Sequence, residues 1–183
     1  MAWKNPDLTL FHGTLERHAR SIGTAGVSLA AGRTYVDFGQ GFYLTSSRHQ
    51  AEQWANTALR KWRRKSRGPG RAAVLAYDID RNALANLSHL VFTLENVAAD
   101  FWAFVAHCRA TAPVSHGCAI PGRTPTNLYD VVIGPVTSWP QSIVLKDCDQ
   151  WSFHTSTALK TLPSRSHPGD DARLLLPPSG DIF

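Results

Sequence analysis

The segment that most limits the fold of this chain is an amphipathic helix, which we expect between Ser47 and the run SRGPG at 66–70. Apolar residues recur there at spacings of three and four, which puts one apolar stripe along three turns. Ser47 can cap the helix, and Gln50 stands three residues later in the capping-box position. The pattern predicts a long helix with one inner face, formed by Ala51, Trp54, Ala55, Ala58, Leu59 and Trp62.

Most of the other apolar runs are short, and several are β-branched or aromatic, which is typical of strands. We expect a first strand at 8–11 that ends at His12-Gly13-Thr14, and a glycine-containing loop over 24–41. The remaining predicted strands are 42–45, 72–80, 89–94, 127–136 (closed by Gly134-Pro135), 141–147 and 150–155. The remaining predicted helices are 15–23 (stopped by Gly23), 96–110 and 156–162.

These elements predict an α+β protein, because strands outnumber helices and no regular βαβ alternation is present. The glycines of GQG at 39–41 precede a strand-like run, not a helix, and a third glycine of the dinucleotide fingerprint is missing. A Rossmann fold is therefore not expected.

Length and composition favour one soluble globular domain. The chain has 183 residues with 43% hydrophobic and 18% charged residues, which is typical of a folded protein. We expect a domain over 1–162 and a proline-rich C-terminal tail over 163–183. No apolar run is long enough to span a membrane, and the N-terminal residues lack a secretory signal. We therefore expect a cytoplasmic protein, or one delivered into a target cell, with no membrane partner.

Two compositional features carry weaker signals. The segment RKWRRKSRGPGR at 60–71 is dense in Lys and Arg. It fits the C-terminal end of a helix, where cations are favoured, or a patch that binds the phosphates of a nucleic acid or dinucleotide. The cysteines are odd in number and widely spaced, so we expect neither a disulfide framework nor a metal. A zinc site from His107, Cys108, His116 and Cys118 lacks a compact ligand pair.

Single residues give little indication of function when taken one at a time. His12 at a strand end is typical of a polar surface residue. Tyr43 and Trp54 are typical of core aromatics. Gly13 allows a ligand to approach the backbone closely. Asp37 fits either a turn-forming Asx residue or a site residue.

Three motifs taken in order give a stronger signal. They are LFHGT at 10–14, GQGFYLT at 39–45 with Trp54 eleven residues beyond its tyrosine, and DQWSFHT at 149–155. Together they resemble the ADP-ribosyltransferase superfamily, in the diphtheria-toxin and poly(ADP-ribose) polymerase branch, which has a His, a Tyr and a Glu on three strands. More closely, the chain resembles a compact bacterial family within that branch, over residues 8 to about 162.

The resemblance implies two packed, mainly antiparallel sheets around a cleft for NAD, which is a substrate. His12 would hold the adenosine ribose, and Gly13 would bond the nicotinamide amide through its backbone. Tyr43 and Trp54 would sandwich the nicotinamide ring, where stacking and a cation–π term favour the bound pyridinium. Further residues implied to line the NAD site are Thr14, Asp37, Gly41 and Phe42.

The third catalytic position departs from the commonest pattern, because Gln150 stands where many transferases have glutamate. A carboxylate stabilises the oxocarbenium-like transition state of glycosidic cleavage, whereas glutamine can only orient the ribose through its dipole. Asp147 and Asp149 should lie on the strand face opposite Gln150. The resembling family also carries glutamine here, so we interpret it as a family variant.

The expected function is therefore mono-ADP-ribosyl transfer from NAD to a protein or nucleic-acid acceptor, by a bacterial toxin or effector. His12, Tyr43 and Gln150 would be its catalytic residues. An antitoxin or immunity protein is a further expected partner. Two alternatives remain open, namely an NAD glycohydrolase and a non-catalytic module that binds NAD or ADP-ribose.

Overall fold

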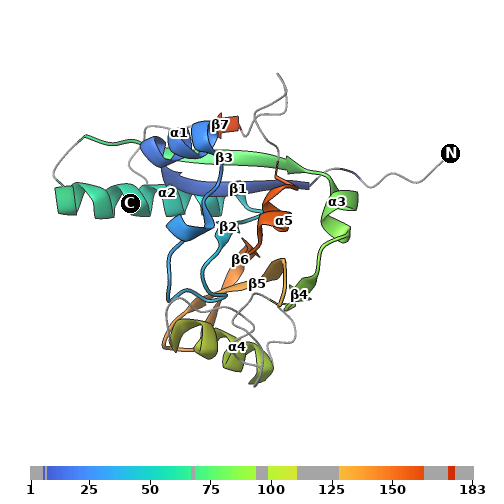
Figure 1. The fold of residues 1–183 in the computed structure, drawn as a ribbon. Coiled ribbons are helices and arrows are strands. Elements are labelled where there is room, and N and C mark those ends of the chain that lie inside the picture. The colour runs from blue at the N-terminus through green and yellow to red at the C-terminus, as the bar shows by residue number, and fades with distance from the viewer. Residues whose placement is uncertain are drawn as a thin grey trace.

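The computed structural model describes residue 6 and residues 8–66, 69–93, 99–110, 128–162 and 173–175. In these residues the chain forms two mainly antiparallel sheets with helices packed around them (Figure 1). The predicted α+β class with two sheets is confirmed at this level.

The first sheet has the strand order β1-β3-β7, with β1 at Leu8–Leu15, β3 at Ala72–Ile79 and β7 at Arg173–Leu175. Both pairings are antiparallel. Helix α1, at Glu16–Ala25, packs on one face, where Ala19 meets Leu75. Helix α2, at Arg48–Ser66, packs on the other face. This sheet is therefore covered by a helix on each side.

The second sheet has the order β2-β6-β5-β4. Its strands are β2 (Phe42–Leu44), β4 (His89–Val91), β5 (Val131–Ser138) and β6 (Ile143–Phe153). Among the strands that the structure describes in this sheet, only β4 and β5 pair in parallel. Phe38 lies on one face of this sheet, together with Phe101 and Val105 from α4, which spans Ala99–Ala110. The segment before β2 and helix α4 thus cover the face that carries Tyr43.

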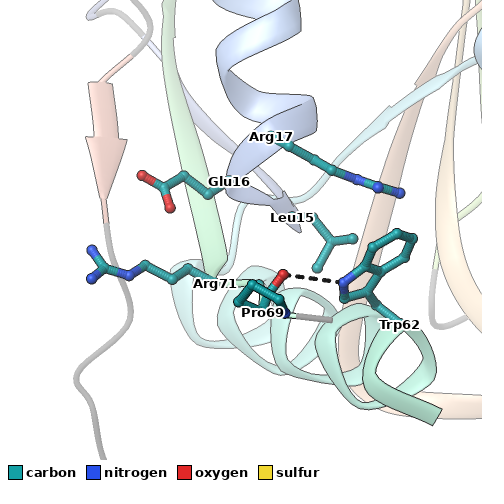
Figure 2. A pocket seen from close by; sticks show the side chains of 7 residues that line it. Leu15, Glu16, Arg17, Trp62, Pro69 and Arg71 are labelled. Atoms are coloured by element: carbon teal, nitrogen blue, oxygen red, sulfur yellow. Dashed lines mark hydrogen bonds between the residues drawn. The ribbon is translucent and has the colours of Figure 1, made fainter. Parts of the chain in front are cut away.

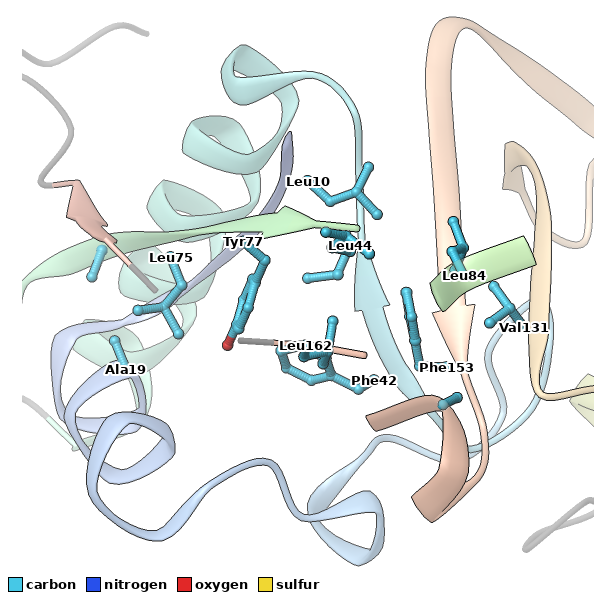
Figure 3. Packing of buried hydrophobic residues seen from close by; sticks show 13 residues of the cluster. Leu10, Ala19, Phe42, Leu44, Leu75, Tyr77, Leu84, Val131, Phe153 and Leu162 are labelled. Atoms are coloured by element: carbon cyan, nitrogen blue, oxygen red, sulfur yellow. The ribbon is translucent and has the colours of Figure 1, made fainter. Parts of the chain in front are cut away.

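The main hydrophobic core fills the space between the two sheets (Figure 3). Leu10 and Tyr77 from the first sheet and Phe42, Leu44 and Phe153 from the second are almost completely buried in it. The short alternating runs of the sequence explain this layer, because every second side chain of a strand faces the same side.

Helix α2 follows the predicted stripe in part, since Trp54, Ala58 and Trp62 are half-buried and lie outside the cluster that the helix forms with the sheet. Ala51 and Ala55 are fully buried against Val74 and Phe11, and Leu59 packs beside them. The Oγ of Ser47 accepts a hydrogen bond from the N–H of Gln50 at 3.2 Å, as a helix cap does. The other half of the capping box is absent, because the Gln50 side chain bonds the backbone of Asp149 on β6.

Several predicted boundaries are wrong. Strand β1 continues through Gly13 to Leu15, and β5 continues through Pro135 to Ser138. Helix α1 runs past Gly23 and is followed by Gly26, whose φ of 81° suits glycine. The strands expected at 141–147 and 150–155 are one strand, β6, because β5 pairs with both parts. A short 3-10 helix, Leu29–Ala31, interrupts the loop expected over 24–41.

The remaining elements are helices α3 at Arg81–Ala85 and α5 at Ser156–Leu159. Parts of three predicted elements lie outside the described residues, namely 94, 96–98 and 127, as does most of the expected tail. Within that tail, β7 is extended and hydrogen-bonded to β3. Across the described ranges, no helix is long and apolar enough to cross a membrane.

Candidate functional site

The three sequence motifs lie on β1, β2 and β6, and the first two meet at one backbone bridge. The N–H and C=O of Phe11 bond Thr45 at 2.8 and 2.9 Å. In this register Gly13 would face Tyr43 if the two strands stayed paired, but within the described chain the pairing stops at the bridge. Since alternate residues of a strand point their backbone groups to the same side, the N–H and C=O of Gly13 point toward this unpaired stretch.

His12 connects the two strands where their backbones part. Its Nδ1 lies 2.8 Å from the carbonyl oxygen of Tyr43. A carbonyl only accepts, so Nδ1–H is the donor, and in the neutral ring Nε2 carries the lone pair. Burial lowers the pKa of the imidazole, and the bond to Tyr43 opposes this shift. His12 is therefore held as a neutral ring with one fixed tautomer, over the ring of Phe42 at a centroid distance of 4.6 Å.

Gly13 is required by the fold itself. A Cβ at this position would lie 1.9 Å from the carbonyl oxygen of Ala51 on α2. No side chain fits between β1 and this helix, so α2 can approach the strand closely. The glycine that was predicted for ligand access therefore has a structural role, and its role in binding stays a prediction.

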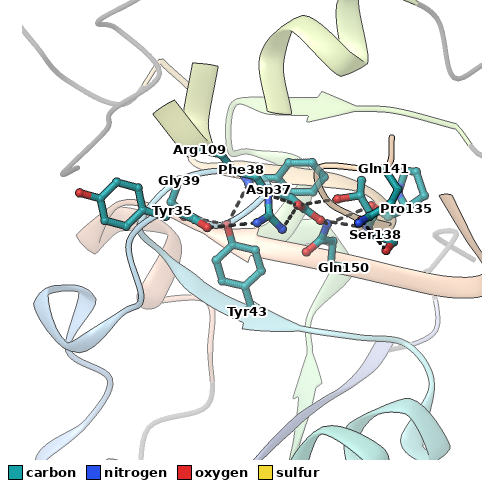
Figure 4. Close-up of polar contacts among 11 residues, drawn as sticks. Tyr35, Asp37, Phe38, Gly39, Tyr43, Arg109, Pro135, Ser138, Gln141 and Gln150 are labelled. Atoms are coloured by element: carbon teal, nitrogen blue, oxygen red, sulfur yellow. Dashed lines mark hydrogen bonds and ion pairs between the residues drawn. The ribbon is translucent and has the colours of Figure 1, made fainter. Parts of the chain in front are cut away.

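Tyr43 points from β2 toward the segment that carries Asp37 (Figure 4). Its hydroxyl donates to the carbonyl of Gly39 at 2.6 Å and accepts from the N–H of Phe38 at 3.1 Å. Burial is the main cause that raises the pKa of this phenol far above its ordinary range. The side chain of Tyr43 is therefore fixed at its backbone by β2 and at its hydroxyl by the hydrogen bonds to the preceding loop.

Asp37 is a buried carboxylate, 3% exposed, that joins three distant parts of the chain. Arg109 on α4 donates to its Oδ1 from Nε at 2.8 Å and from Nη2 at 2.5 Å. Thr137 on β5 donates its hydroxyl to Oδ1 at 2.7 Å and its N–H to Oδ2 at 3.1 Å. Gln150 on β6 donates its amide to Oδ2 at 2.7 Å. Such a charge is tolerated inside a protein because it is paired and fully hydrogen-bonded.

Gln150 is also buried, at 5% exposed, and its amide nitrogen makes a second bond, to the carbonyl of Pro135 at 2.9 Å. Both N–H groups are thus used, which fixes the orientation of the amide. Among the described residues no donor is bonded to Oε1, so this oxygen is the atom of Gln150 that can accept a further hydrogen bond.

The aspartate next to Gln150 in the sequence, Asp149, lies elsewhere, as strand alternation predicted. Asp149 accepts hydrogen bonds from Thr45, from the N–H of Ser46 and from the indole of Trp151, on the face away from Asp37. Asp147 is exposed. The carboxylate beside Gln150 is Asp37, which the sequence offered only as a secondary candidate.

The other predicted site residues lie in different surroundings. Phe42 belongs to the core between the sheets, and Thr14 is half-buried on β1. A Cβ on Gly41 would lie 2.7 Å from the Ser152 hydroxyl, so any other residue there would require the side chains of Ser152 and His154 to shift. Trp54 lies half-buried on α2, and in the described chain no ring contact joins it to Tyr43. A nicotinamide sandwich requires a gap between two rings, so that expectation stays a prediction.

Sequence reasoning missed Arg109 and Thr137, which stand 72 and 100 residues from Asp37. The one available signal was Asp37 itself, a carboxylate between the apolar residues Val36 and Phe38 that needs partners if it is buried. For metals, the described residues contain no group of three or more His, Cys, Asp or Glu side chains that could hold an ion. His116 and Cys118 of the discounted zinc set lie outside them.

Fold and site together define an α+β protein with two mainly antiparallel sheets, in which a buried Asp–Gln pair, joined by a partly exposed arginine, lies beside a tyrosine. The chain belongs to the family described as "Protein of unknown function (DUF3990)", whose model matches residues 8–139. That match includes His12, Asp37, Tyr43 and Arg109, and it ends before Gln150. A search of curated proteins finds no match.

Proposed function

We propose that the chain is a mono-ADP-ribosyltransferase that moves ADP-ribose from NAD to a macromolecular acceptor, on an ADP-ribosyltransferase-like arrangement of its two sheets. The observation that carries the proposal is the convergence of the three motifs. His12 bonds the backbone of Tyr43 at 2.8 Å. Tyr43 and Gln150 lie on one face of the second sheet, because Tyr43 pairs with Ser152, two residues from Gln150.

The β1–β2 junction supplies groups suited to NAD. The N–H and C=O of Gly13 point to the side where the strands part and match the donor and acceptor of a carboxamide. Nε2 of His12 can accept a hydrogen bond from a ribose hydroxyl, since Nδ1–H is engaged with Tyr43. The Tyr43 ring offers a flat apolar surface for the nicotinamide.

The Asp37–Gln150 pair offers a physical reason for glutamine in the third position. The ribosyl transition state carries positive charge, and Oε1 of Gln150 is the acceptor available to a ribose hydroxyl. The amide donates to a carboxylate at 2.7 Å, which polarises it and makes Oε1 a stronger acceptor. A glutamate at 150 would place two carboxylates in hydrogen-bond contact, and we infer that Asp37 requires a neutral partner there.

We expect single transfer and not chain elongation, which relies on the glutamate in the resembling enzymes. A role as a bacterial toxin or effector, with an antitoxin or immunity protein as partner, fits a transferase of this kind and forms part of the proposal. The acceptor is a protein or a nucleic acid.

The test incubates the purified chain with NAD labelled in its ADP-ribose part and with a cell lysate, then digests portions with nuclease or protease. The wild type should label one class of polymer. Tyr43→Phe should retain label because it keeps the ring, whereas Tyr43→Ala should lose it at equal folded fraction. Free ADP-ribose with no labelled polymer would replace the transferase by a glycohydrolase. Intact NAD that still stabilises the fold would leave a binding module.

A further inference from the structure

A second feature lies at the far end of β1 from the bridge with Thr45. A hollow of about 340 Å³ opens where β1 ends, α1 begins and α2 ends (Figure 2). Leu15, Trp62 and Pro69 provide apolar lining, and Arg17 and Arg71 add two cationic side chains. Both arginines are exposed to solvent. The hollow therefore combines an apolar surface with positive charge, and the proposed NAD chemistry does not use it.

Trp62 is held in a fixed position within this hollow. The guanidinium carbon of Arg17 lies 3.6 Å from the centre of the Trp62 ring system, which is a close cation–π stack. The indole N–H donates a long hydrogen bond, 3.4 Å, to the carbonyl of Pro69. Stacked aromatic and guanidinium planes of this kind are the surfaces on which unpaired nucleic-acid bases stack.

The positive charge around the hollow is greater than the favourable interaction of cations with a helix C-terminus explains. Exposed cations occupy nearly every position around Trp62 on α2, namely Arg60, Lys61, Arg63, Arg64 and Lys65. Two pairs among them, Arg60 with Arg64 and Lys61 with Lys65, are like charges four residues apart, which destabilise a helix. Glu16 is the acidic residue among those that line the hollow, and Arg20 pairs with it at 2.7 Å. The surface is thus complementary to a polyanion.

We propose that this hollow and the adjacent basic turns of α2 bind a single-stranded nucleic acid. Trp62 and Arg17 would stack an unpaired base, and the cations of α2 would follow its phosphates. Leu15 is three residues from His12 on β1, roughly 10 Å along the strand. That this nucleic acid is an acceptor for ADP-ribose rests on the proposed function. That the hollow binds a nucleic acid does not.

The test measures the fluorescence anisotropy of a short labelled single-stranded oligonucleotide, as DNA and as RNA, without NAD and over a range of salt. The wild type should bind the single strand more tightly than a duplex of the same sequence. Trp62→Ala should weaken binding about ten-fold or more. Arg17→Gln should weaken it several-fold, and because Arg17 is exposed, this variant stays informative if Trp62→Ala does not fold.

The phosphate contacts are tested separately through salt dependence. Replacement of Arg63, Arg64 and Lys65 together by glutamine should reduce the slope of log affinity against log salt by about two. The matched control is Arg81→Gln, an exposed arginine on α3, which should bind like the wild type.

Three results would overturn the proposal. The first is that the duplex binds as tightly as the single strand or more tightly. The second is that folded Trp62→Ala and Arg17→Gln both bind with wild-type affinity. The third is that poly-glutamate displaces the oligonucleotide as readily as the unlabelled single strand does. The last would indicate an acidic protein partner. Because the assay contains no NAD, its failure is distinct from a failure of the proposed chemistry.

Discussion

The carboxylate of Asp37 lies 2.7 Å from the amide nitrogen of Gln150, although 113 residues separate them in the sequence. Both side chains are almost fully buried. A carboxylate accepts and cannot donate at neutral pH, so its neighbour must be a donor. Glutamine meets this requirement and glutamate does not. The identity of residue 150 is therefore tied to the charge at residue 37.

Gln150→Glu should destabilise the fold at neutral pH and be tolerated in acid. Of two carboxylates in contact, one has a raised pKa and is protonated in the folded state. The introduced glutamate ionises at a pH of about 4.3 in the unfolded chain. Above this pH the folded variant binds more protons than the unfolded chain, so its stability falls as the pH rises. Thermal unfolding measured at increasing pH above this value should show a melting temperature that falls further and further below that of the wild type. Asp37→Asn added to Gln150→Glu should recover part of it, whereas a Gln150→Glu variant as stable as wild type at neutral pH would rule out the explanation.

Arg109→Met should cost about 3–5 kcal/mol of unfolding free energy, because it leaves the Asp37 charge buried without its cation. Denaturant titration measures this value. Arg48→Gln is the matched control, since it breaks a surface ion pair with Glu52 and should cost below about 1 kcal/mol. Similar losses for the two arginines would mean that the buried Asp37 carboxylate does not depend on Arg109 for its stability.

Gly13→Ala should cost about 3 kcal/mol or more, because its methyl group would overlap the Ala51 carbonyl and displace α2. Gly26→Ala provides the comparison. That glycine has a φ of 81° and a ψ of 179°, a conformation used almost solely by glycine, and open space around its Cβ position, so its cost should be limited to backbone strain, about 1–3 kcal/mol. Calorimetric unfolding of both variants gives the ranking, and an equal or reversed order would contradict the close packing of α2 on β1.

His12→Asn should reduce the loss of stability in acid. The folded pKa of His12 is lowered, so the unfolded chain binds its proton first, at a pH near 6.5. Stability is therefore lost as pH falls below that value. Asparagine keeps a donor for the Tyr43 carbonyl but does not titrate. The melting temperature of the variant minus that of the wild type should rise as the pH falls from about 7.5 to about 5.5, a range that spans the ordinary pKa of histidine. Parallel curves would contradict a neutral imidazole with a lowered pKa.

Much of the fold could be predicted from local patterns. The stripe of α2, with Ala51 and Ala55 on its inner face, and the buried run of β3 are set by neighbours three, four or two positions away. Strand β6 was divided in the prediction because its polar stretch, around Asp147, reads as a loop. In the structure one strand runs through this stretch, although the φ of Asp147 is 55° and the ladder with β5 has an irregularity near Pro135. Strand β5 pairs with Ile143 and Val144 before the stretch and with 149–153 after it, and this pairing on both sides joins the two predicted strands into one.

The candidate site was predictable in its motifs and not in its network. His12, Tyr43 and Gln150 could be named because each lies in a short recognisable run. The partners of Asp37 could not, because Arg109 lies on α4 and Thr137 on β5, and only the tertiary fold brings them to one carboxylate. Side chains that meet across such separations leave no periodicity in the sequence.

The most direct measurement of the central claim is the amount of nicotinamide that the purified chain releases from NAD in the presence of a cell lysate. Both transfer and hydrolysis break the nicotinamide–ribose bond, so release reports the chemistry whatever the acceptor. The wild type and Arg48→Gln should release nicotinamide, and Gln150→Ala should release about a hundred-fold less at equal folded fraction. No release above an enzyme-free blank, or equal release by Gln150→Ala, would contradict an NAD-cleaving site built on His12, Tyr43 and Gln150.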